Sequence, residues 1–94
     1  MELAWDEKKR LANIRKHGFD FADCAQVFMG PLVTSLDVQF EYGEPRFIAA
    51  GLIRNRVVVV AYAEAHGAIR VVSMRKACKH EETYYFENLS RLQN

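Results

Sequence analysis

The chain has 94 residues, of which half are hydrophobic and 27% are charged, and its formal net charge is +1. This length and composition indicate one small globular domain, residues 1–94, and exclude a disordered or fibrous protein. There is no apolar run long enough to span a bilayer and no basic leader followed by an apolar stretch, so we expect a cytoplasmic protein. Cys24 and Cys78 lie far apart without neighbours at metal-ligand spacing, which predicts two reduced, buried thiols, no metal site and no cofactor.

Charge is distributed unevenly despite the near-neutral sum. Bases crowd the stretch from Lys8 to Lys16, whereas Phe19 to Pro45 contains acids and no base. Such polarity suits an anionic ligand at one end of the molecule and a cationic partner at the other. The alternative is that both stretches are simply solvated surfaces.

The first elements are marked by capping residues. Leu3 to Trp5 forms either a short strand or an apolar anchor, and Asp6 is a suitable N-cap for a helix from about Glu7 to His17, which Gly18 ends. Within this helix Lys9, Asn13 and Lys16 share one face, so they can contact a phosphate chain together. The alternative is an exposed polar face.

A second helix and an outer strand follow. Asp20 caps a short helix from about Phe21 to Phe28, whose apolar residues repeat at helical spacing and indicate core packing. Proline at position 31 ends this helix. Leu32 to Leu36 is expected to form an outer strand, and the acidic stretch Asp37 to Glu44 a mobile connecting loop.

The pattern from Arg46 onward is that of two hairpins. A two-residue turn at 54–55 places Leu52 beside Val57 and Ile48 beside Ala61, and a turn at 66–67 places Ala63 beside Arg70. Arg46 and Arg70 then flank Ala63 on one face, at a separation suited to holding one phosphodiester. The same face is expected to carry Val72 and Met74. Both faces are apolar, so helices cover each of them or one face takes a partner.

The last helix is expected to run from about Arg75 to Leu92. Cys78, Tyr85, Leu89 and Leu92 form its apolar stripe. A second face carries His80, Glu81 and Tyr84, and with Arg70 and Arg75 these groups suit proton transfer and charge stabilisation on a phosphate, in one compact positive site. The alternative gives Glu81 a surface ion pair and leaves Tyr84 half-buried.

Four motifs in this order resemble the BrnT toxin family, and together they cover nearly the whole chain. They are W-D-x-x-K with N-x-x-K-H-G (Trp5 to Gly18), FADCAQVFMGP (Phe21 to Pro31), E-x-R-F with Gly51 (Glu44 to Phe47), and R-x-x-S-x-R-K-A (Arg70 to Ala77). The resemblance implies an α+β, RelE-like fold: a small antiparallel sheet with two N-terminal helices and one C-terminal helix.

The resemblance also implies a function. Such proteins are ribonuclease toxins of type II toxin-antitoxin systems, which cleave RNA without metal and inhibit translation. It implies a BrnA-like antitoxin that neutralises the toxin in a higher-order complex and contacts DNA, so that the pair represses its own operon. Within this picture the expected catalytic residues are Arg70, Arg75, Glu64, His80, Glu81 and Tyr84, and the expected RNA-binding residues are Trp5, Lys9, Lys16, Arg46 and Lys76. His17 is a weaker candidate for proton transfer.

Two other classes of function remain open from the sequence. The chain is alternatively a non-catalytic binding module that completes a DNA-binding repressor. It is alternatively a nuclease acting on DNA with a divalent metal, although it lacks the clustered carboxylates that such a site needs.

Overall fold

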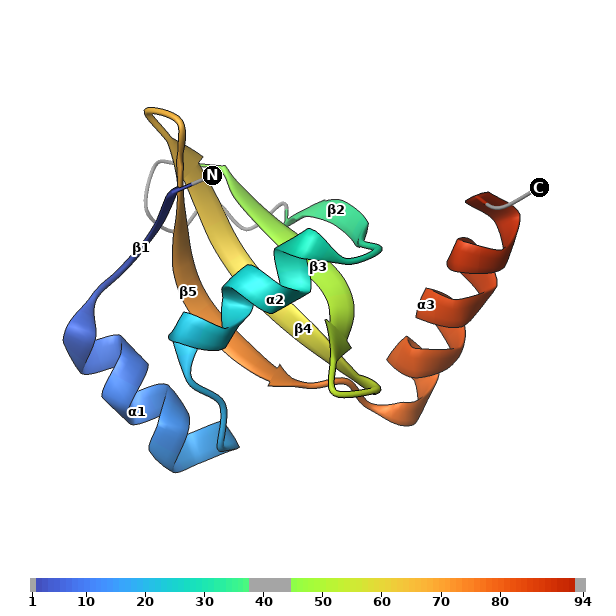
Figure 1. Ribbon diagram of the computed structural model, residues 1–94, viewed down its shortest axis with the longest axis horizontal. Coiled ribbons are helices and arrows are strands. Elements are labelled where there is room, and N and C mark those ends of the chain that lie inside the picture. The colour runs from blue at the N-terminus through green and yellow to red at the C-terminus, as the bar shows by residue number, and fades with distance from the viewer. Residues whose placement is uncertain (1, 38–44, 93–94) are drawn as a thin grey trace.

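The computed structural model describes residues 2–37 and 45–92, which form a five-stranded sheet with helices around it (Figure 1). The α+β class is confirmed. Residues 38–44 of the expected acidic loop lie outside the described residues. Within the described ranges, none of the helices is both long and apolar enough to cross a membrane. The elements are β1 (Glu2–Trp5), α1 (Glu7–His17), the 3-10 helix η1 (Phe21–Asp23), α2 (Cys24–Met29), β2 (Val33–Asp37), β3 (Arg46–Ile53), β4 (Arg56–Ala65), β5 (Ala68–Lys76) and α3 (Lys79–Leu92).

The strand order is β1-β5-β4-β3-β2. β2 to β5 are antiparallel neighbours, but β1 pairs with β5 in parallel. The sheet is therefore mixed, whereas a purely antiparallel sheet was expected. Only hairpins fix strand direction from local sequence. β1 belongs to no hairpin, and its neighbour is therefore decided by tertiary packing.

Both predicted hairpin registers are confirmed. Leu52 pairs with Val57 and Ile48 with Ala61 between β3 and β4, and Ala63 pairs with Arg70 between β4 and β5. Each turn has two central residues with positive φ, at 54–55 and at 66–67. This conformation matches the right-handed twist of the flanking strands.

A β-bulge interrupts β5 and was not predicted. Ala61 pairs with Ser73, but the next residue, Tyr62, pairs with Val71, so Val72 is an extra residue in β5. Inserting one residue reverses the inward and outward alternation of everything that follows it. Ser73 therefore lies on the opposite face from the one that simple alternation from Val71 would predict.

The bulge corrects two expectations about the end of β5. Met74 pairs with Val60 and joins the core beneath α2, so its expected place on the face of Arg70 is wrong. Arg75 pairs with Val59 inside β5, and α3 begins only at Lys79, not near Arg75. Continued pairing with β4 satisfies the backbone of this stretch and outweighs its local helical pattern.

The two faces of the sheet are named here for the helices that pack on them. The α2 face holds the larger core, in which Phe21, Cys24 and Val27 from η1 and α2 cover residues including Ala49, Ile53, Val58, Val60, Tyr62, Val71 and Met74. Helix α2 approaches β3 closely: a Cβ at Gly51 would lie 2.6 Å from Val27 Cγ1. Only glycine fits at that position. Cys24 is buried as expected, and burial raises the pKa of its thiol to about 12.

The α3 face holds a smaller core. Val57 and Val59 pack with Ala77 and Tyr85, and Leu89 joins them from α3. The hydroxyl of Tyr85 donates a hydrogen bond of 2.8 Å to the carbonyl oxygen of Pro31. The predicted stripe is therefore right for two of its members.

Cys78 does not belong to that stripe. It precedes α3 and is exposed, so the expectation of a second buried thiol is wrong. Because the helix starts later than expected, the residue lies in the connection from β5 and not on a helical face. The side chain of Leu92 is outside the described part of the chain.

Helix α1 is fastened beside β5 by a buried amide. Asn13 Nδ2 donates to the carbonyl oxygens of Met74 at 2.8 Å and Phe19 at 3.0 Å, while Asn13 Oδ1 accepts from Met74 N at 3.1 Å. Asn13 is thus committed to the fold and is not part of an exposed phosphate-contacting face. Arg10 adds a two-pronged contact to Asp20, which lowers the pKa of that carboxyl.

Candidate functional site

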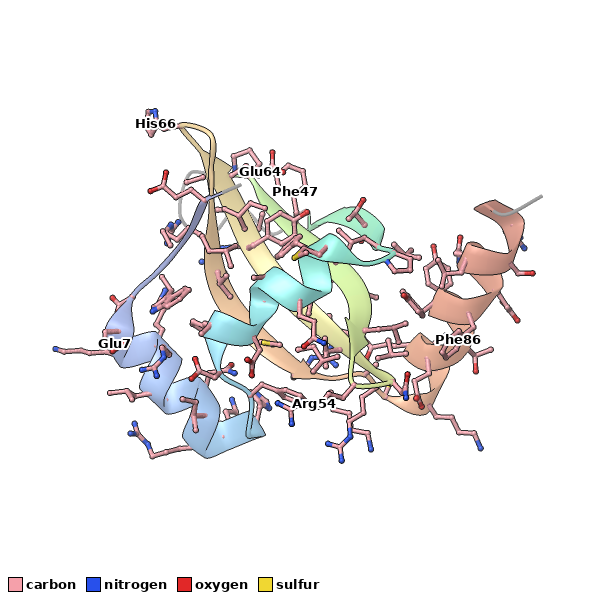
Figure 2. The ribbon with its side chains drawn as sticks, viewed as in Figure 1. Glu7, Phe47, Arg54, Glu64, His66 and Phe86 are labelled. Carbon is pink, nitrogen blue, oxygen red and sulfur yellow. The ribbon has the colours of Figure 1, made fainter. Side chains whose placement is uncertain are left out.

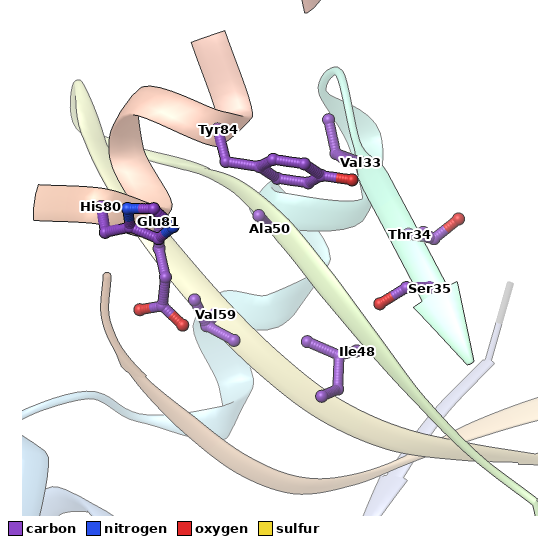
Figure 3. A pocket seen from close by; sticks show the side chains of 9 residues that line it. All are labelled: Val33, Thr34, Ser35, Ile48, Ala50, Val59, His80, Glu81 and Tyr84. Carbon is purple, nitrogen blue, oxygen red and sulfur yellow. The ribbon is translucent and has the colours of Figure 1, made fainter. Parts of the chain in front are cut away.

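A hollow of about 300 Å³ lies on the α3 face, between the first turns of α3 and strands β2 and β3 (Figure 3). His80, Glu81 and Tyr84, three of the residues singled out from sequence, line it together. Figure 3 shows the Tyr84 ring extending from α3 toward β2. The sheet contributes the other lining residues, namely Val33, Thr34, Ser35, Ile48, Ala50 and Val59. An apolar floor with a few polar groups at its edge is typical of ligand sites.

Arg75 and Glu81 form a two-pronged ion pair beside this hollow. Arg75 Nη1 and Nη2 donate to Glu81 Oε1 at 2.8 Å and Oε2 at 2.9 Å. Glu81 Oε1 also accepts a hydrogen bond of 2.9 Å from the backbone nitrogen of Cys78. The guanidinium of Arg75, followed by the backbone hydrogen bond, lowers the pKa of Glu81 to about 2, so this carboxyl is ionised near neutral pH.

The pair leaves part of the guanidinium open. Nη1 is shared between Glu81 and the carbonyl oxygen of Lys76, at 3.3 Å, whereas Nε has no partner among the described residues. In Arg10 the edge of the guanidinium formed by Nε and Nη2 holds both carboxylate oxygens of Asp20. The edge of Arg75 formed by Nε and Nη2 can therefore hold two oxygens of an anion while Glu81 fixes the opposite edge.

Arg70 lies on the same face but at the other end of it. It pairs with Ala63, whereas Arg75 pairs with Val59, four residues away along β4. At roughly 3.3 Å per residue the two arginine backbones are about 13 Å apart. The expected compact site is therefore an elongated strip of the α3 face, with Arg75 at one end and Arg70 at the other. Arg46 shares the Arg70 end, because alternation along β3 puts it on the face of Ile48.

The middle of this strip is lined by small side chains. Ala61 pairs with Ile48 on one side and Ser73 on the other, and Ser35 pairs with Ile48 from β2. The hydroxyls of Ser35 and Ser73 were not singled out from sequence as site residues. Ser73 carried a usable signal, since it lies within the motif from Arg70 to Ala77.

Lys9 and Lys16 flank the strip along β5. They line a shallow hollow with Val72 and Ser73, at the junction of α1 with the bulge. Their predicted shared face is therefore next to the α3 face, although the amide of Asn13 between them is used for packing.

Three of the expected site residues lie elsewhere. Glu64 pairs with Ile69 and projects from the α2 face, where its charge adds to burial in raising the pKa of Tyr62; Figure 2 shows it near Phe47. Trp5 packs against the core of the α2 face. Lys76 pairs with Val58 and also projects from the α2 face. Among the described residues, no three His, Cys, Asp or Glu side chains are grouped to hold a metal ion.

Together these features define a small α+β protein with an incompletely covered sheet face edged by cations, which suits a phosphate-bearing ligand. A family model described as the ribonuclease toxin BrnT of type II toxin-antitoxin systems matches residues 5–81. The chain belongs to this family, as its motifs had indicated. The match ends at Glu81, so Tyr84 lies beyond it. A search of the curated proteins found no match.

Proposed function

We propose that the protein cleaves RNA on the α3 face without a metal ion. The 2′-hydroxyl of one nucleotide attacks the adjacent phosphate, the bond to the 5′-oxygen breaks, and the products carry a 2′,3′-cyclic phosphate and a 5′-hydroxyl. The observation that carries this proposal is the Arg75–Glu81 pair, which holds a guanidinium in one orientation at an open hollow. Charge that develops on the phosphate oxygens can then be stabilised by a group already in place.

Proton transfer is assigned to residues of the hollow. A base must take the proton of the 2′-hydroxyl and an acid must give one to the departing 5′-oxygen. His80 and Tyr84 line the hollow and supply an imidazole and a phenol for these steps. Glu81 is ionised and engaged by Arg75, so we assign it to positioning the guanidinium. Glu64 projects from the opposite face and is left out of the proposal.

The remaining cations are assigned to phosphates on either side of the cleaved bond. Arg70 and Arg46 lie at the far end of the strip, and Lys9 and Lys16 run along its β5 edge. Contacts of this kind position the nucleic acid backbone and carry little sequence information. The hydroxyls of the strip are available to the ribose or the bases.

We further propose a BrnA-like antitoxin as the partner that neutralises the toxin. Tyr84 and Phe86 on α3 are 58% and 50% exposed, so this helix offers apolar surface that a protein partner can bury. A partner that buried Tyr84 would also cover the hollow, because Tyr84 lines it. Contact with DNA and repression of the operon are assigned to the antitoxin within a larger complex.

The test is cleavage of RNA by purified protein in the presence of EDTA. Arg75→Ala should slow single-turnover cleavage by roughly two to three orders of magnitude, the scale of losing one oxyanion donor. Arg75→Lys should be nearly as damaging, because an ammonium cannot provide the planar two-pronged contact. Lys9→Ala should instead weaken RNA binding more than it slows saturated turnover, and this loss of affinity should shrink as the salt concentration rises.

The outcomes separate the proposed enzyme from a binding module. Arg15→Ala removes one exposed cation of α1 that lines none of these hollows, and it should cleave at the wild-type rate. Intact RNA with folded wild-type protein would remove the ribonuclease proposal for this chain. Antitoxin binding that persisted in that case would favour a non-catalytic module, which the exposed aromatic side chains of α3 also suit.

A further inference from the structure

A second hollow, of about 480 Å³, lies at the end of the sheet where α1 ends and α3 begins. We call it the hairpin hollow, because the β3–β4 turn forms one of its walls and the connection from α1 to η1 forms another. Figure 2 shows Arg54 at this end of the molecule. The lining residues are His17, Gly18, Phe19, Asp23, Ile53, Arg54, Arg56 and Lys76.

Positive charge is concentrated in the hairpin hollow. Arg54, Arg56 and Lys76 face a single carboxylate, that of Asp23. Within residues 2–37 and 45–92, none of these three cations has a carboxylate at ion-pairing distance. By contrast, Arg10 and Arg75 each hold a carboxylate in a two-pronged pair. Unpaired like charges gathered around one hollow repel one another, and an anion placed among them relieves that repulsion.

The backbone at Arg54 gives an independent indication. Arg54 has φ 47° and is the first of the two turn residues between β3 and β4. Glycine or asparagine adopts this left-handed conformation most easily, whereas a long side chain is disfavoured there. A cation held at such a position suggests that its side chain has a use beyond the turn itself.

The hairpin hollow is linked to the α3 face through the end of β5. Arg75 and Lys76 are consecutive residues that project from opposite faces, since they pair with Val59 and Val58. An anionic chain held by Arg75 can therefore reach the hairpin hollow by passing around the last residue of β5. A guanidinium also matches the geometry of phosphate oxygens better than an ammonium does, because its planar group can donate two parallel hydrogen bonds.

We propose that the hairpin hollow is a second phosphate-binding site, which holds the RNA backbone after it has left the α3 face. This inference rests on the proposed function, because it names where the same RNA chain goes. It assigns Arg54, Arg56 and Lys76 to substrate binding. The ligand class is a backbone phosphate of single-stranded RNA.

The experiment measures binding of RNA that cannot be cleaved because its 2′-hydroxyls are methylated. Fluorescence anisotropy over a salt series compares a trinucleotide with a long single-stranded oligonucleotide. The test variant combines Arg54→Asn, which suits the left-handed turn, with Arg56→Gln. Arg15→Gln is the control, since it removes an exposed cation outside the hollow. Melting curves establish that each variant is folded.

The double variant should bind the long RNA about tenfold more weakly than the control at low salt. Its slope of log K against log salt should fall by roughly 0.7 for each phosphate that the protein no longer neutralises. Trinucleotide binding should respond much less, because a ligand with two phosphodiesters that is held on the α3 face leaves few phosphates for a second site. The expected signature is therefore a weakening of binding that grows with RNA length.

Two results would overturn the inference. One is a double variant that binds the long RNA with the affinity and salt slope of the control. The other is unchanged RNA binding with weaker antitoxin binding, which would assign the hairpin hollow to the protein partner. The proposed function is judged separately by cleavage of unmodified RNA. If the wild-type protein cleaved RNA but the double variant bound the long RNA as the control does, this inference would fail and the proposed function would stand.

Discussion

The ion pair of Arg75 and Glu81 gives a stability prediction with a defined pH dependence. Glu81→Gln keeps the size of the side chain and an oxygen that can accept from Cys78 N, but removes the charge that fixes the guanidinium. The pKa of Glu81 is lowered from 4.5 to about 2 in the folded protein. The ionised carboxylate therefore stabilises the folded state at neutral pH.

The size of the effect follows from this pKa and from solvent exposure. Lowering a pKa by one pH unit corresponds to about 1.4 kcal/mol, which sets an upper limit of about 3–4 kcal/mol for Glu81. The side chains of Arg75 and Glu81 are 43% and 31% exposed, so water screens their attraction. We therefore expect Glu81→Gln to lower the free energy of unfolding at pH 7 by about 1–2 kcal/mol.

The assay is thermal unfolding of wild type, Glu81→Gln and Glu82→Gln across a pH series. Each 1 kcal/mol should lower the melting temperature by roughly 4–8 °C in a domain of this size. Because the folded pKa is below the unfolded one, the stabilisation is complete above about pH 4.5 and disappears as the pH falls toward 2. The wild type and Glu81→Gln should thus converge in acid. Glu82 is the neighbouring acid of α3 and has no ion pair among the described residues, so its variant should melt close to wild type.

Two outcomes would refute this reasoning. If Glu81→Gln and Glu82→Gln melted alike at pH 7, the pair would contribute nothing to the attachment of α3. If the destabilisation caused by Glu81→Gln were the same at pH 2 and pH 7, it would arise from packing and not from charge. A further expectation is slower RNA cleavage by Glu81→Gln, because Arg75 would no longer be held in one orientation.

Two other predictions concern a buried amide and the two thiols. Asn13→Ala should lower the free energy of unfolding, measured by urea titration, by about 2–4 kcal/mol, because it leaves a backbone N–H and a carbonyl of β5 without partners. A decrease below about 1 kcal/mol would show that water replaces the amide. In the native protein near neutral pH, a thiol reagent should modify Cys78 rapidly and Cys24 only on unfolding, because Cys24 is buried and its pKa is about 12. Equal rates of modification in the Cys24→Ser and Cys78→Ser variants would contradict this.

Local patterns in the sequence determined several features correctly. The bounds of α1 follow from Asp6, whose side chain accepts from two backbone nitrogens, and from Gly18, whose φ is 78°. The registers of both hairpins follow from two-residue turns and alternating apolar residues. Family membership followed from motifs spread along the chain. Caps, turns and alternation act between residues close in sequence, so they can be recognised without knowing the fold.

The composition of the site was accessible only in part. Arg75, His80, Glu81 and Tyr84 were singled out by charge and helical spacing, and all four lie around the first hollow or its ion pair. Glu64 lies on the opposite face from Arg70, and this already follows from the predicted register. Ala63 pairs with Arg70, and its neighbour Glu64 must face the other side of the sheet.

Tertiary structure alone decided the bulge at Val72, the parallel partner of β1 and the burial of Asn13. The bulge moves Met74 into the core and turns Arg75 toward the α3 face, while Asn13 binds the backbone of a residue far away in the sequence. Each of these depends on which distant segments pack together, and one inserted residue reverses the side of every residue after it. Local propensities at these positions therefore do not reveal the arrangement that long-range pairing selects.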